Sequence, residues 1–281
     1  GGVEQADARL LSPAVPPLHQ AYPKPPLNIL VGLIGGLGIG ALWVIARNHW
    51  GGKIKTVEEA ERLTGRSVVA QIPEFSDRRV NVIDVFSRRP ASPLAEAVRG
   101  LRSAVQIRDL DAPPKVVMLA SSVRGEGKST TALLLGQSLA TWGKKVLVIE
   151  CDVRHCVLAT RLEMPAQQGI LSVLAGLEKF EDVVTQPPGR SVDLLMGEAT
   201  SANAADVFST RRFDDLLEGL RARYDYIVLD APPVLHFAEA RTIAPRADLI
   251  IYLVRAGHSV TREVRRGLKS LHTAGAPAMD I

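Results

Sequence analysis

The chain has 281 residues, 46% of them hydrophobic and 23% charged, which fits a sizeable α/β domain with smaller attachments and excludes a disordered chain. Its formal net charge is +4 and the basic residues are spread along the sequence, so we expect no nucleic acid partner. Its two cysteines, Cys151 and Cys156, lack a second Cys or His pair at zinc spacing, which indicates reduced thiols in a cytosolic domain.

The first predicted element is a transmembrane helix over residues 27–47, with a proline-rich extracytoplasmic stalk over residues 1–26 before it. The apolar run 27–46 holds one polar side chain, Asn28, and no charge. At about 1.5 Å per residue, such a run crosses the roughly 30 Å hydrocarbon core of a bilayer. A buried helix of a soluble domain is the alternative, but the five glycines of the run would weaken it in water. A cleavable signal peptide is disfavoured by the length of the run.

The charges that flank the apolar run predict its orientation. Arg47, His49, Lys53 and Lys55 follow it closely, whereas only Lys24 lies close before it. Cytoplasmic flanks carry the excess of Lys and Arg. We therefore expect everything after the span to lie in the cytoplasm, where ATP is available.

Residues 48–91 are predicted to form a juxtamembrane segment and a linker. Thr56 and Glu59 have the spacing of a capping box, which predicts a short helix over 56–65. The sequence SVVAQIP, residues 67–73, reads as a strand stopped by proline. The rest of the segment loses all periodicity and is expected to be a linker.

A helix is then predicted for SPLAEAVRGLRSAVQI, because Ser92 can cap it and Pro93 suits its first turn. Glu96, Arg99 and Arg102 recur at every third residue and fall within about one third of the helix circumference. Such a stripe is either a solvated face or a bridge to a neighbouring subunit, since Arg forms bidentate pairs.

A phosphate-binding loop follows, within a predicted strand-helix-strand unit. Residues 115–122 read as a buried strand, 129–143 as an amphipathic helix and 145–150 as the next buried strand. The sequence SSVRGEGKST lies where the first strand becomes the helix, so backbone N–H groups can hold phosphate at the helix N-terminus. The predicted nucleotide-binding residues are Gly125, Glu126, Gly127, Lys128, Ser129 and Thr130.

The residues of this loop predict ATP and Mg²⁺ as cofactors. Lys128 would reach the β- and γ-phosphates, and the Ser129 hydroxyl would ligate Mg²⁺. The pattern GxxxxGK[ST] requires glycine where this chain has Ser122, a residue small enough to preserve the room.

Acidic residues at two further strand ends are the candidate metal ligands. Glu150 and Asp152 end the strand after the loop, and Asp230 ends the strand in YDYIVLDAPPVL. Parallel strands bring their carboxyl ends to one edge, so Asp152 and Asp230 are predicted to hold Mg²⁺. These carboxylates could instead cap a following turn. Arg154, close by, could touch phosphate or a neighbouring subunit.

The remaining pattern predicts an α/β P-loop NTPase with a mostly parallel, doubly wound sheet over residues 92–281. Further strands are expected at 191–197 and 247–257, and helical material at 203–224. His155 and His236 are isolated and are expected to be structural.

The order of these motifs resembles that of the bacterial tyrosine kinases (BY-kinases) joined to polysaccharide co-polymerases, membrane proteins that govern the chain length and export of capsular or exopolysaccharide. The resemblance covers nearly the whole chain and implies an ATP-dependent tyrosine autokinase in the bacterial inner membrane, with a cytoplasmic kinase domain. It implies that Lys128, Glu150, Asp152 and Asp230 are catalytic, with Glu150 orienting or deprotonating the tyrosine hydroxyl. It also implies that Glu96, Arg99 and Arg102 form a ring interface, so that the tyrosine tail of one subunit enters the site of the next. The polysaccharide polymerisation and export machinery would be a further partner.

The chain departs from the family at several positions. Glu150 stands where the family usually has Asp, Arg124 stands where it often has Pro, and no cluster of tyrosines is present. Because the chain starts at Gly1 and stops at what reads as the opening of a buried strand, we expect it to be a fragment cut at both ends, the kinase domain being truncated at its C-terminus.

Two alternatives stay open at this point. One is a non-catalytic scaffold that binds nucleotide without transferring phosphate, which Glu150 and the missing tyrosine cluster leave possible. The other is a partition-type P-loop ATPase, although Val123 stands where those ATPases carry a signature lysine.

Overall fold

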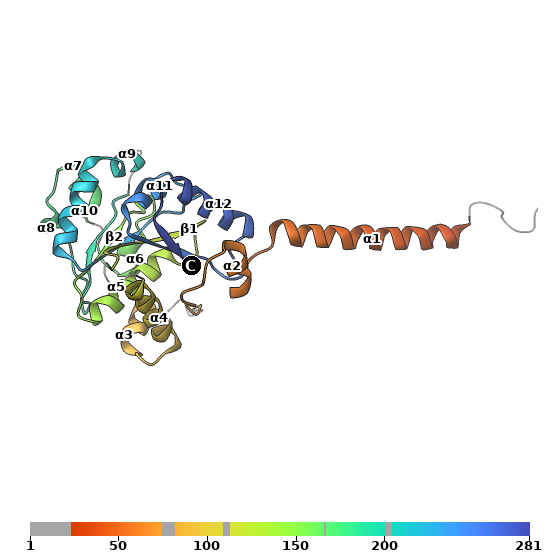
Figure 1. Cartoon of the computed structure of the whole chain (residues 1–281), viewed down its shortest axis with the longest axis horizontal. Coiled ribbons are helices and arrows are strands. Elements are labelled where there is room, and N and C mark those ends of the chain that lie inside the picture. The colour runs from red at the N-terminus through yellow and green to blue at the C-terminus, as the bar shows by residue number, and fades with distance from the viewer. Residues whose placement is uncertain (1–23, 75–81, 109–112, 166, 200–203) are drawn as a thin grey trace, which may run out of the picture. The chain divides into compact units, whose positions relative to one another are not determined.

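The computed structural model describes residues 24–74, 82–108, 113–165, 167–199 and 204–281 (Figure 1). The chain divides into two units, Gly1–Trp50 and Gly51–Ile281. The predicted proline-rich stalk lies almost wholly outside the described residues.

The first unit consists, as far as it is described, of helix α1 (Pro25–Gly51). Among the described residues this is the one helix long and apolar enough to cross a membrane, with a mean hydropathy of 2.1 over Pro25–Ile45. None of that stretch is buried in the protein, and its large apolar side chains from Leu27 to Ile45 are more than half exposed. An apolar helix without a protein partner is typical of a segment that is covered by lipid.

The second unit is built on a sheet of six strands, all of whose pairings are parallel, in the order β3-β2-β4-β1-β5-β6. The strands are β1 (Val116–Ser121), β2 (Val146–Glu150), β3 (Asp193–Leu195), β4 (Tyr226–Asp230), β5 (Leu249–Leu253) and β6 (Ala278–Asp280). The strands predicted within 115–122, 145–150, 191–197, 247–257 and before Asp230 are confirmed. The parallel, doubly wound α/β class is confirmed as well.

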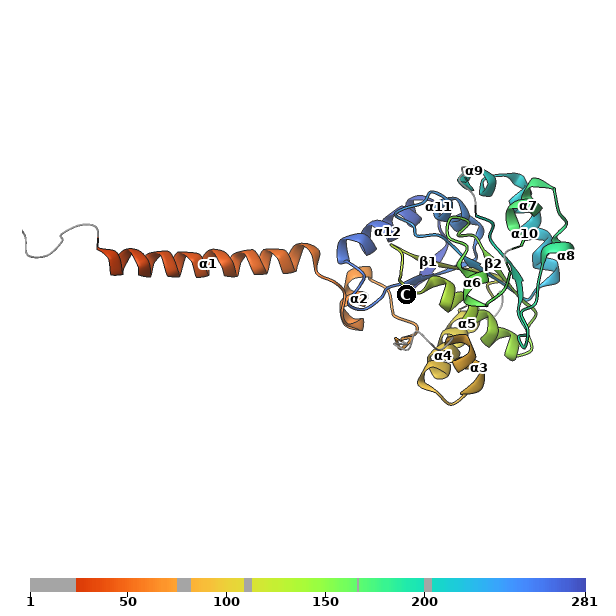
Figure 2. The ribbon, with the colours of Figure 1, turned by 180° about the vertical axis from the view of Figure 1, so that it is seen from behind.

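Helices cover both faces of the sheet, as Figures 1 and 2 show. On one face lie α3 (Val82–Arg88), α4 (Pro93–Ile107) and α5 (Lys128–Thr141). The remaining helices of the unit are α2 (Val57–Thr64), α6 (Val157–Arg161), α7 (Ile170–Ala175), α8 (Phe180–Val183), α9 (Ala204–Phe208), α10 (Arg211–Arg223), α11 (Glu239–Ile243), the 3₁₀ turn η1 (Ala244–Arg246) and α12 (Thr261–Thr273). Of these, α10, α11 and α12 cover the opposite face.

Alternation along the strands explains the two cores that result. In β1, Val116, Met118 and Ala120 point into one core, while Val117 and Leu119 point into the other. Because successive side chains of a strand face opposite sides, a strand that is covered on both faces must be apolar throughout. The uninterrupted apolar runs in the sequence follow from this arrangement.

Several local predictions near the amino end of the unit can now be compared with the structure. The capping box is confirmed, since the Thr56 hydroxyl accepts a hydrogen bond from Glu59 N and α2 follows it. The strand predicted over 67–73 is wrong, because these residues form no regular element. Val69 N donates to Ile281 O at 2.7 Å, but the neighbouring apolar side chains pack against both cores instead of alternating. The apolar residues of this segment are therefore explained by packing against the cores and do not indicate a strand.

Two helices also differ from their predictions. Residues 82–88, expected to be linker, form α3, and its Phe86 packs into the core shared with α4 and α5. The helix α5 is not amphipathic: its residues from Thr131 to Ala140 are all buried, because it is enclosed by the sheet, α3 and α4. The helix predicted after Ser92 is confirmed as α4, with the Ser92 hydroxyl capping it at Ala95 N.

Candidate nucleotide-binding site

The register of the sheet brings the predicted acidic residues to one edge. Glu150 of β2 and Leu119 of β1 both pair with Asp230 of β4, so Asp230 lies between the ends of the two other strands. Cys151 N donates to Asp230 O at 2.9 Å, which continues the pairing beyond the strands. Since β1 leads directly into the glycine-rich loop, the loop and the acidic strand ends share this edge.

The loop has the backbone that its glycines were predicted to supply. Gly125 and Gly127 have φ values of 82° and 99°, in the region where a side chain would be strained, and α5 begins at Lys128. The carboxylate of Glu126 is buried and accepts hydrogen bonds from Val123 N, at 2.8 Å, and from the Ser259 hydroxyl. Glu126 therefore fixes the shape of the loop from inside.

Contacts from β5 and from the segment that follows it hold the loop from outside, and the sequence analysis missed them. The Tyr252 hydroxyl lies 2.6 Å from the Ser122 hydroxyl, and both side chains are buried. Arg255 Nη1 donates to Gly125 O at 2.9 Å, and His258 Nε2 lies 3.1 Å from Arg124 O. Ser122, which departs from the usual glycine, thus has a buried hydrogen-bond partner. A tyrosine within an apolar strand was the one available signal.

Lys128 and Asp230 are oppositely charged and buried at the centre of the site. Burial lowers the pKa of Lys128, while the charges of Asp230, Asp152 and Glu126 oppose that effect. Burial raises the pKa of Asp230 to about 7, although the Ser129 hydroxyl and Lys128 act in the other direction. Lys128 Nζ donates to the Ser121 hydroxyl at 2.8 Å. The electrostatic coupling places Lys128, Asp152 and Asp230 in one cluster.

Asp230 is also an orphaned buried carboxylate: the Ser129 hydroxyl is near enough to favour its charged form, but neither carboxylate oxygen has a hydrogen bond of normal geometry among the described residues. An unpartnered buried carboxylate is costly unless a cation or a donor arrives. Within the described part of the chain, no group of three or more His, Cys, Asp or Glu side chains converges to make a protein-only metal cage. That pattern suits Mg²⁺, which takes one or two carboxylates and completes its shell with water and phosphate oxygens.

Asp152 and Arg154 follow β2 and have defined partners. The carboxylate of Asp152 accepts from His155 Nδ1 at 2.9 Å, so His155 orients the predicted metal ligand. Arg154 Nη2 donates to Glu239 at 3.0 Å, and Glu239 is buried. Arg154 is thus held inside the domain by Glu239, and no phosphate contact or subunit contact follows from its position.

The structure places Glu150 at the edge of the sheet but engages both of its oxygens. One accepts from Leu158 N at 2.9 Å and the other from Gly197 N at 3.0 Å. Burial raises the pKa of Glu150, and these N–H donors oppose the rise. Its carboxylate therefore ties the start of α6 to the turn after β3. Both oxygens of Glu150 are thus engaged by backbone N–H groups, and its expected contact with a tyrosine hydroxyl stays a prediction.

The remaining predicted loop residues lie beside a large cavity. Thr130 Oγ1 accepts a hydrogen bond from Arg161 Nη1 at 2.7 Å. A cavity of about 1080 Å³ is lined by Thr130, the loop from Gly125 to Gly127, the end of β5 and residues 68–74. Lys128, Ser129, Asp152 and Asp230 are not among its lining residues, so the cavity lies to one side of the acidic cluster.

The surroundings of the two cysteines disfavour their thiolate forms. Burial raises the pKa of Cys151 well above its ordinary value, and burial with the nearby Glu150 and Asp152 carboxylates raises that of Cys156 to about 12. A thiol reacts as its thiolate, so neither residue is suited to covalent catalysis at neutral pH.

The predicted ring-interface residues lie on α4 and have contacts within the chain. Arg99 pairs with Glu96 and donates to Pro90 O at 2.8 Å. Arg102 lies 5.7 Å from the centre of the Trp142 ring and donates to Ser138 O at 3.3 Å, while its Nε has no hydrogen-bond partner in the part of the chain that the structure describes. Their role in assembly stays a prediction.

Comparison with known proteins agrees with this geometry. The profile of a family described as AAA domain matches residues 114–269, more than half of the chain. The chain belongs to the AAA domain family. The parallel P-loop fold expected from the sequence is the fold of this family, and the match begins just before β1 and ends within α12.

Relatives of this AAA domain include proteins named as tyrosine kinases. The chain is 30% identical over 287 residues to the putative tyrosine-protein kinase EpsB of Ralstonia solanacearum, which covers 98% of the chain and 38% of EpsB. It is 30% identical over 184 residues to the tyrosine-protein kinase YwqD of Bacillus subtilis strain 168, covering 66% of the chain and 78% of YwqD. The crystal structure of the VpsO kinase domain is similar at 31% identity with a TM-score of 0.58, covering 68% of the chain and 98% of that domain.

These matches place the chain among the bacterial tyrosine-protein kinases, as the resemblance of its motifs indicated. The chain spans about two fifths of the length of EpsB. What the whole EpsB protein does beyond that portion does not follow from the shared AAA domain.

Proposed function

We propose that the chain is an ATP-dependent protein-tyrosine kinase. One observation carries the proposal: in a P-loop fold, Lys128 and the orphaned buried carboxylate of Asp230 are coupled at the edge where the phosphate loop begins. A buried lysine beside an unpartnered carboxylate suits a nucleotide with a bound cation. The relatives named as tyrosine-protein kinases support tyrosine as the acceptor.

Each residue of the site then has a chemical task. Loop N–H groups and Lys128 bind the phosphates and stabilise the negative charge of the phosphoryl group in transfer. Ser129, Asp152 and Asp230 would hold Mg²⁺, which would neutralise charge on the phosphate oxygens when bound. Glu150 keeps α6 and the turn at Gly197 in place, so that the Asp152 side chain stays at the edge.

The acceptor tyrosine is proposed to come from elsewhere. Tyr224, Tyr226 and Tyr252 are all buried, and Tyr224 donates to Asp193 at 2.8 Å. A tyrosine must reach the γ-phosphate to react, so none of these three is suited to be the acceptor. A tyrosine tail of a neighbouring subunit, brought in by a ring that uses the Glu96, Arg99 and Arg102 stripe, is the acceptor we propose.

We further propose that α1 anchors the kinase in the bacterial inner membrane, with the AAA domain in the cytoplasm. The exposed apolar surface of α1 and the basic residues that follow it support this orientation. In this setting the kinase would act with the polysaccharide polymerisation and export machinery and regulate the chain length and export of exopolysaccharide.

Incubation with Mg-ATP tests the kinase activity. Because the described tyrosines are buried, the purified chain is given a Glu/Tyr copolymer as acceptor, and phosphotyrosine is detected by antibody and by mass spectrometry. We expect phosphotyrosine from the natural chain and at least about a hundredfold less from Lys128→Met, which loses a transition-state charge. Nucleotide binding without phosphotyrosine on either chain or copolymer would instead support a non-catalytic scaffold.

A further inference from the structure

The helix α12 carries a basic face that has no partner. Arg262, Arg265, Arg266 and Lys269 are exposed, and within the described residues their side chains make no ion pair and no hydrogen bond. At about 100° per residue, these four positions fall within an arc of roughly 100° on the helix. The buried residues of α12, Val264, Gly267 and Leu271, lie on the opposite side.

Many arginines elsewhere in the domain form ion pairs, unlike those of α12. Elsewhere many exposed or half-buried arginines are neutralised by acidic partners, as in the pairs Arg108–Asp280, Arg190–Asp84, Arg221–Asp248 and Arg246–Asp214. Four unpaired basic side chains on one arc are therefore a local departure. Clustered unpaired charge creates a positive potential that attracts an anionic surface.

The acidic groups near this face lie on the packed neighbour α2 and, on α12 itself, outside the basic arc. The packed neighbour α2 contributes Glu59, which accepts from Lys55 N at 3.0 Å, and Glu61, which accepts from Val68 N at 2.9 Å. Glu58 of α2 is exposed, and Glu263 of α12 lies outside the basic arc. No acidic side chain of α12 therefore lies within the arc that holds its four basic residues.

The start of α12 is tied to the residues that directly follow α1. Thr261 N and Oγ1 both donate to Gly52 O, at 3.1 and 3.0 Å, and Gly52 is the next residue after α1. Lys53 forms an antiparallel bridge with Val260, and Ile54 N donates to Ser259 O at 2.9 Å. These contacts hold the start of α12 against residues 52–54, where the chain enters this unit after α1.

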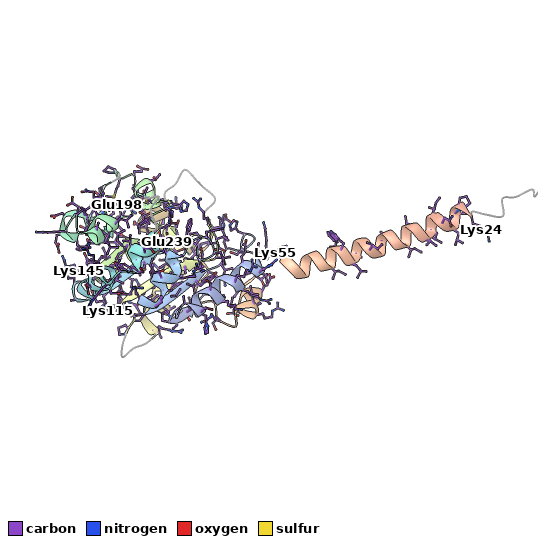
Figure 3. All side chains as sticks on the ribbon, turned by 90° about the horizontal axis from the view of Figure 1, so that it is seen from above. Lys24, Lys55, Lys115, Lys145, Glu198 and Glu239 are labelled. Carbon is purple, nitrogen blue, oxygen red and sulfur yellow. The ribbon has the colours of Figure 1, made fainter. Side chains whose placement is uncertain are left out.

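Two further lysines add to the charge at this position. Lys53 and Lys55 are both exposed, and Figure 3 shows Lys55 at the end of the domain remote from Lys115 and Lys145. Lys115 and Lys145 directly precede β1 and β2 at the amino edge of the sheet, and Lys145 N and Lys115 N donate to Asp225 and Asp248 there. Lys53 and Lys55 thus add positive charge to the segment that is bonded to the start of α12.

We propose that the basic face of α12 binds the anionic phospholipid headgroups of the membrane that α1 crosses. The inference depends on the membrane anchoring proposed above, and it adds a second contact between the kinase domain and the bilayer. Each Lys or Arg close to an anionic leaflet raises the membrane partition coefficient about fivefold. The attraction falls off within the screening length, so it must weaken as salt is added.

Vesicle co-sedimentation of residues 51–281 tests the surface without α1. This unit contains every residue of the two buried cores, so the apolar interior on which its fold depends is complete within it. We expect it to sediment with vesicles of phosphatidylcholine containing about one third phosphatidylglycerol, and not with phosphatidylcholine alone. In about 1 M salt, where the screening length is about 3 Å, it should stay in solution.

Paired variants with equal charge changes separate the α12 face from net charge. Arg265→Gln with Lys269→Gln should lower the partition coefficient about 25-fold. Lys179→Gln with Arg211→Gln removes two exposed charges elsewhere and should lower it less than about twofold. Circular dichroism checks that all forms are folded.

Equal losses in both pairs, or no sedimentation with anionic vesicles at low salt, would overturn the proposal. Tighter binding to duplex DNA than to anionic vesicles would overturn it as well, because a nucleic acid would then be the better ligand. The outcome is independent of the proposed kinase activity: the α12 variants of the full chain in detergent should phosphorylate the copolymer at the natural rate. Loss of vesicle binding with phosphorylation intact would support the lipid-binding role of α12 without bearing on the kinase activity. Absence of phosphorylation in the natural chain would contradict only the proposed kinase activity.

Discussion

Replacing Asp230 with asparagine should remove a pH dependence of stability that the buried carboxylate imposes on the domain. Burial raises the pKa of Asp230 from its ordinary 3.8 to about 7 in the folded chain, against the opposing effects of Ser129 and Lys128. Between these two pKa values the folded state binds more protons than the unfolded state. The free energy of unfolding therefore falls as pH rises through this window and levels off above pH 7.

The slope sets the magnitude. One proton bound in excess changes the free energy of unfolding by about 1.4 kcal/mol per pH unit, and the excess falls to about one half at pH 7, so about 2 kcal/mol is lost between about pH 5 and about pH 7. Asparagine cannot ionise, and its variant should lack this loss. The comparison of two pH profiles also cancels the constant cost of burying an amide in place of a carboxyl group.

Urea unfolding of residues 51–281, followed by circular dichroism from about pH 5 to about pH 8, measures the two profiles. Asp215→Asn is the matched control, since it removes a carboxylate that is 70% exposed and should keep the natural slope. Equal slopes for the natural chain and Asp230→Asn would refute the reasoning, because they would mean that the Asp230 carboxylate is ionised at little cost in the folded state.

Three further variants test the contacts that hold the site. Tyr252→Phe leaves the Ser122 hydroxyl buried without its partner and should lower the free energy of unfolding, measured in urea, by about 1–3 kcal/mol. The same change in a Ser122→Gly background should lower it clearly less. An equal loss in both backgrounds would contradict the pairing. Gly267→Ala would place a Cβ 2.0 Å from the Tyr252 hydroxyl oxygen and should destabilise by about 1–3 kcal/mol, a loss that Tyr252→Phe should partly relieve. Glu150→Gln should lower the free energy of unfolding by about 1–3 kcal/mol yet keep more phosphotyrosine activity than Lys128→Met. If a fully folded Glu150→Gln variant lost as much activity as Lys128→Met, Glu150 would have a direct catalytic role.

The fold was largely predictable because its main signals are local. Strands that are buried on both faces must be apolar throughout, and each ends in a turn. The apolar runs that end at Ser121, Glu150 and Asp230 could therefore be recognised as strands from the sequence. The start of α4 was equally clear from Ser92 and Pro93. Burial by several neighbours is not local, and α5 was therefore predicted to have a polar face that it lacks.

The sequence predicted which residues lie at the site but not which contacts each of them makes. A carboxylate at a strand end signals the edge of the sheet, which the register confirms for Glu150 and Asp230. Whether that carboxylate stays free depends on backbone N–H groups that are distant in sequence, and Glu150 receives two of them from Leu158 and Gly197. The contact of Tyr252 with Ser122 joins positions 130 residues apart, so no spacing rule could reveal it.

The Mg²⁺ dependence of nucleotide affinity tests the central claim most directly. The claim is that Lys128, Asp152 and Asp230 act together on a triphosphate and its metal. Calorimetric titration with a non-hydrolysable ATP analogue, with Mg²⁺ and then with EDTA, gives the gain in affinity due to the metal. For the natural chain we predict that Mg²⁺ raises the nucleotide affinity about tenfold or more. For Asp230→Asn we predict almost no change in affinity on adding Mg²⁺, because a lost metal ligand costs about 1.4 kcal/mol or more. An unchanged gain in Asp230→Asn, with affinity retained in Lys128→Met, would contradict the account.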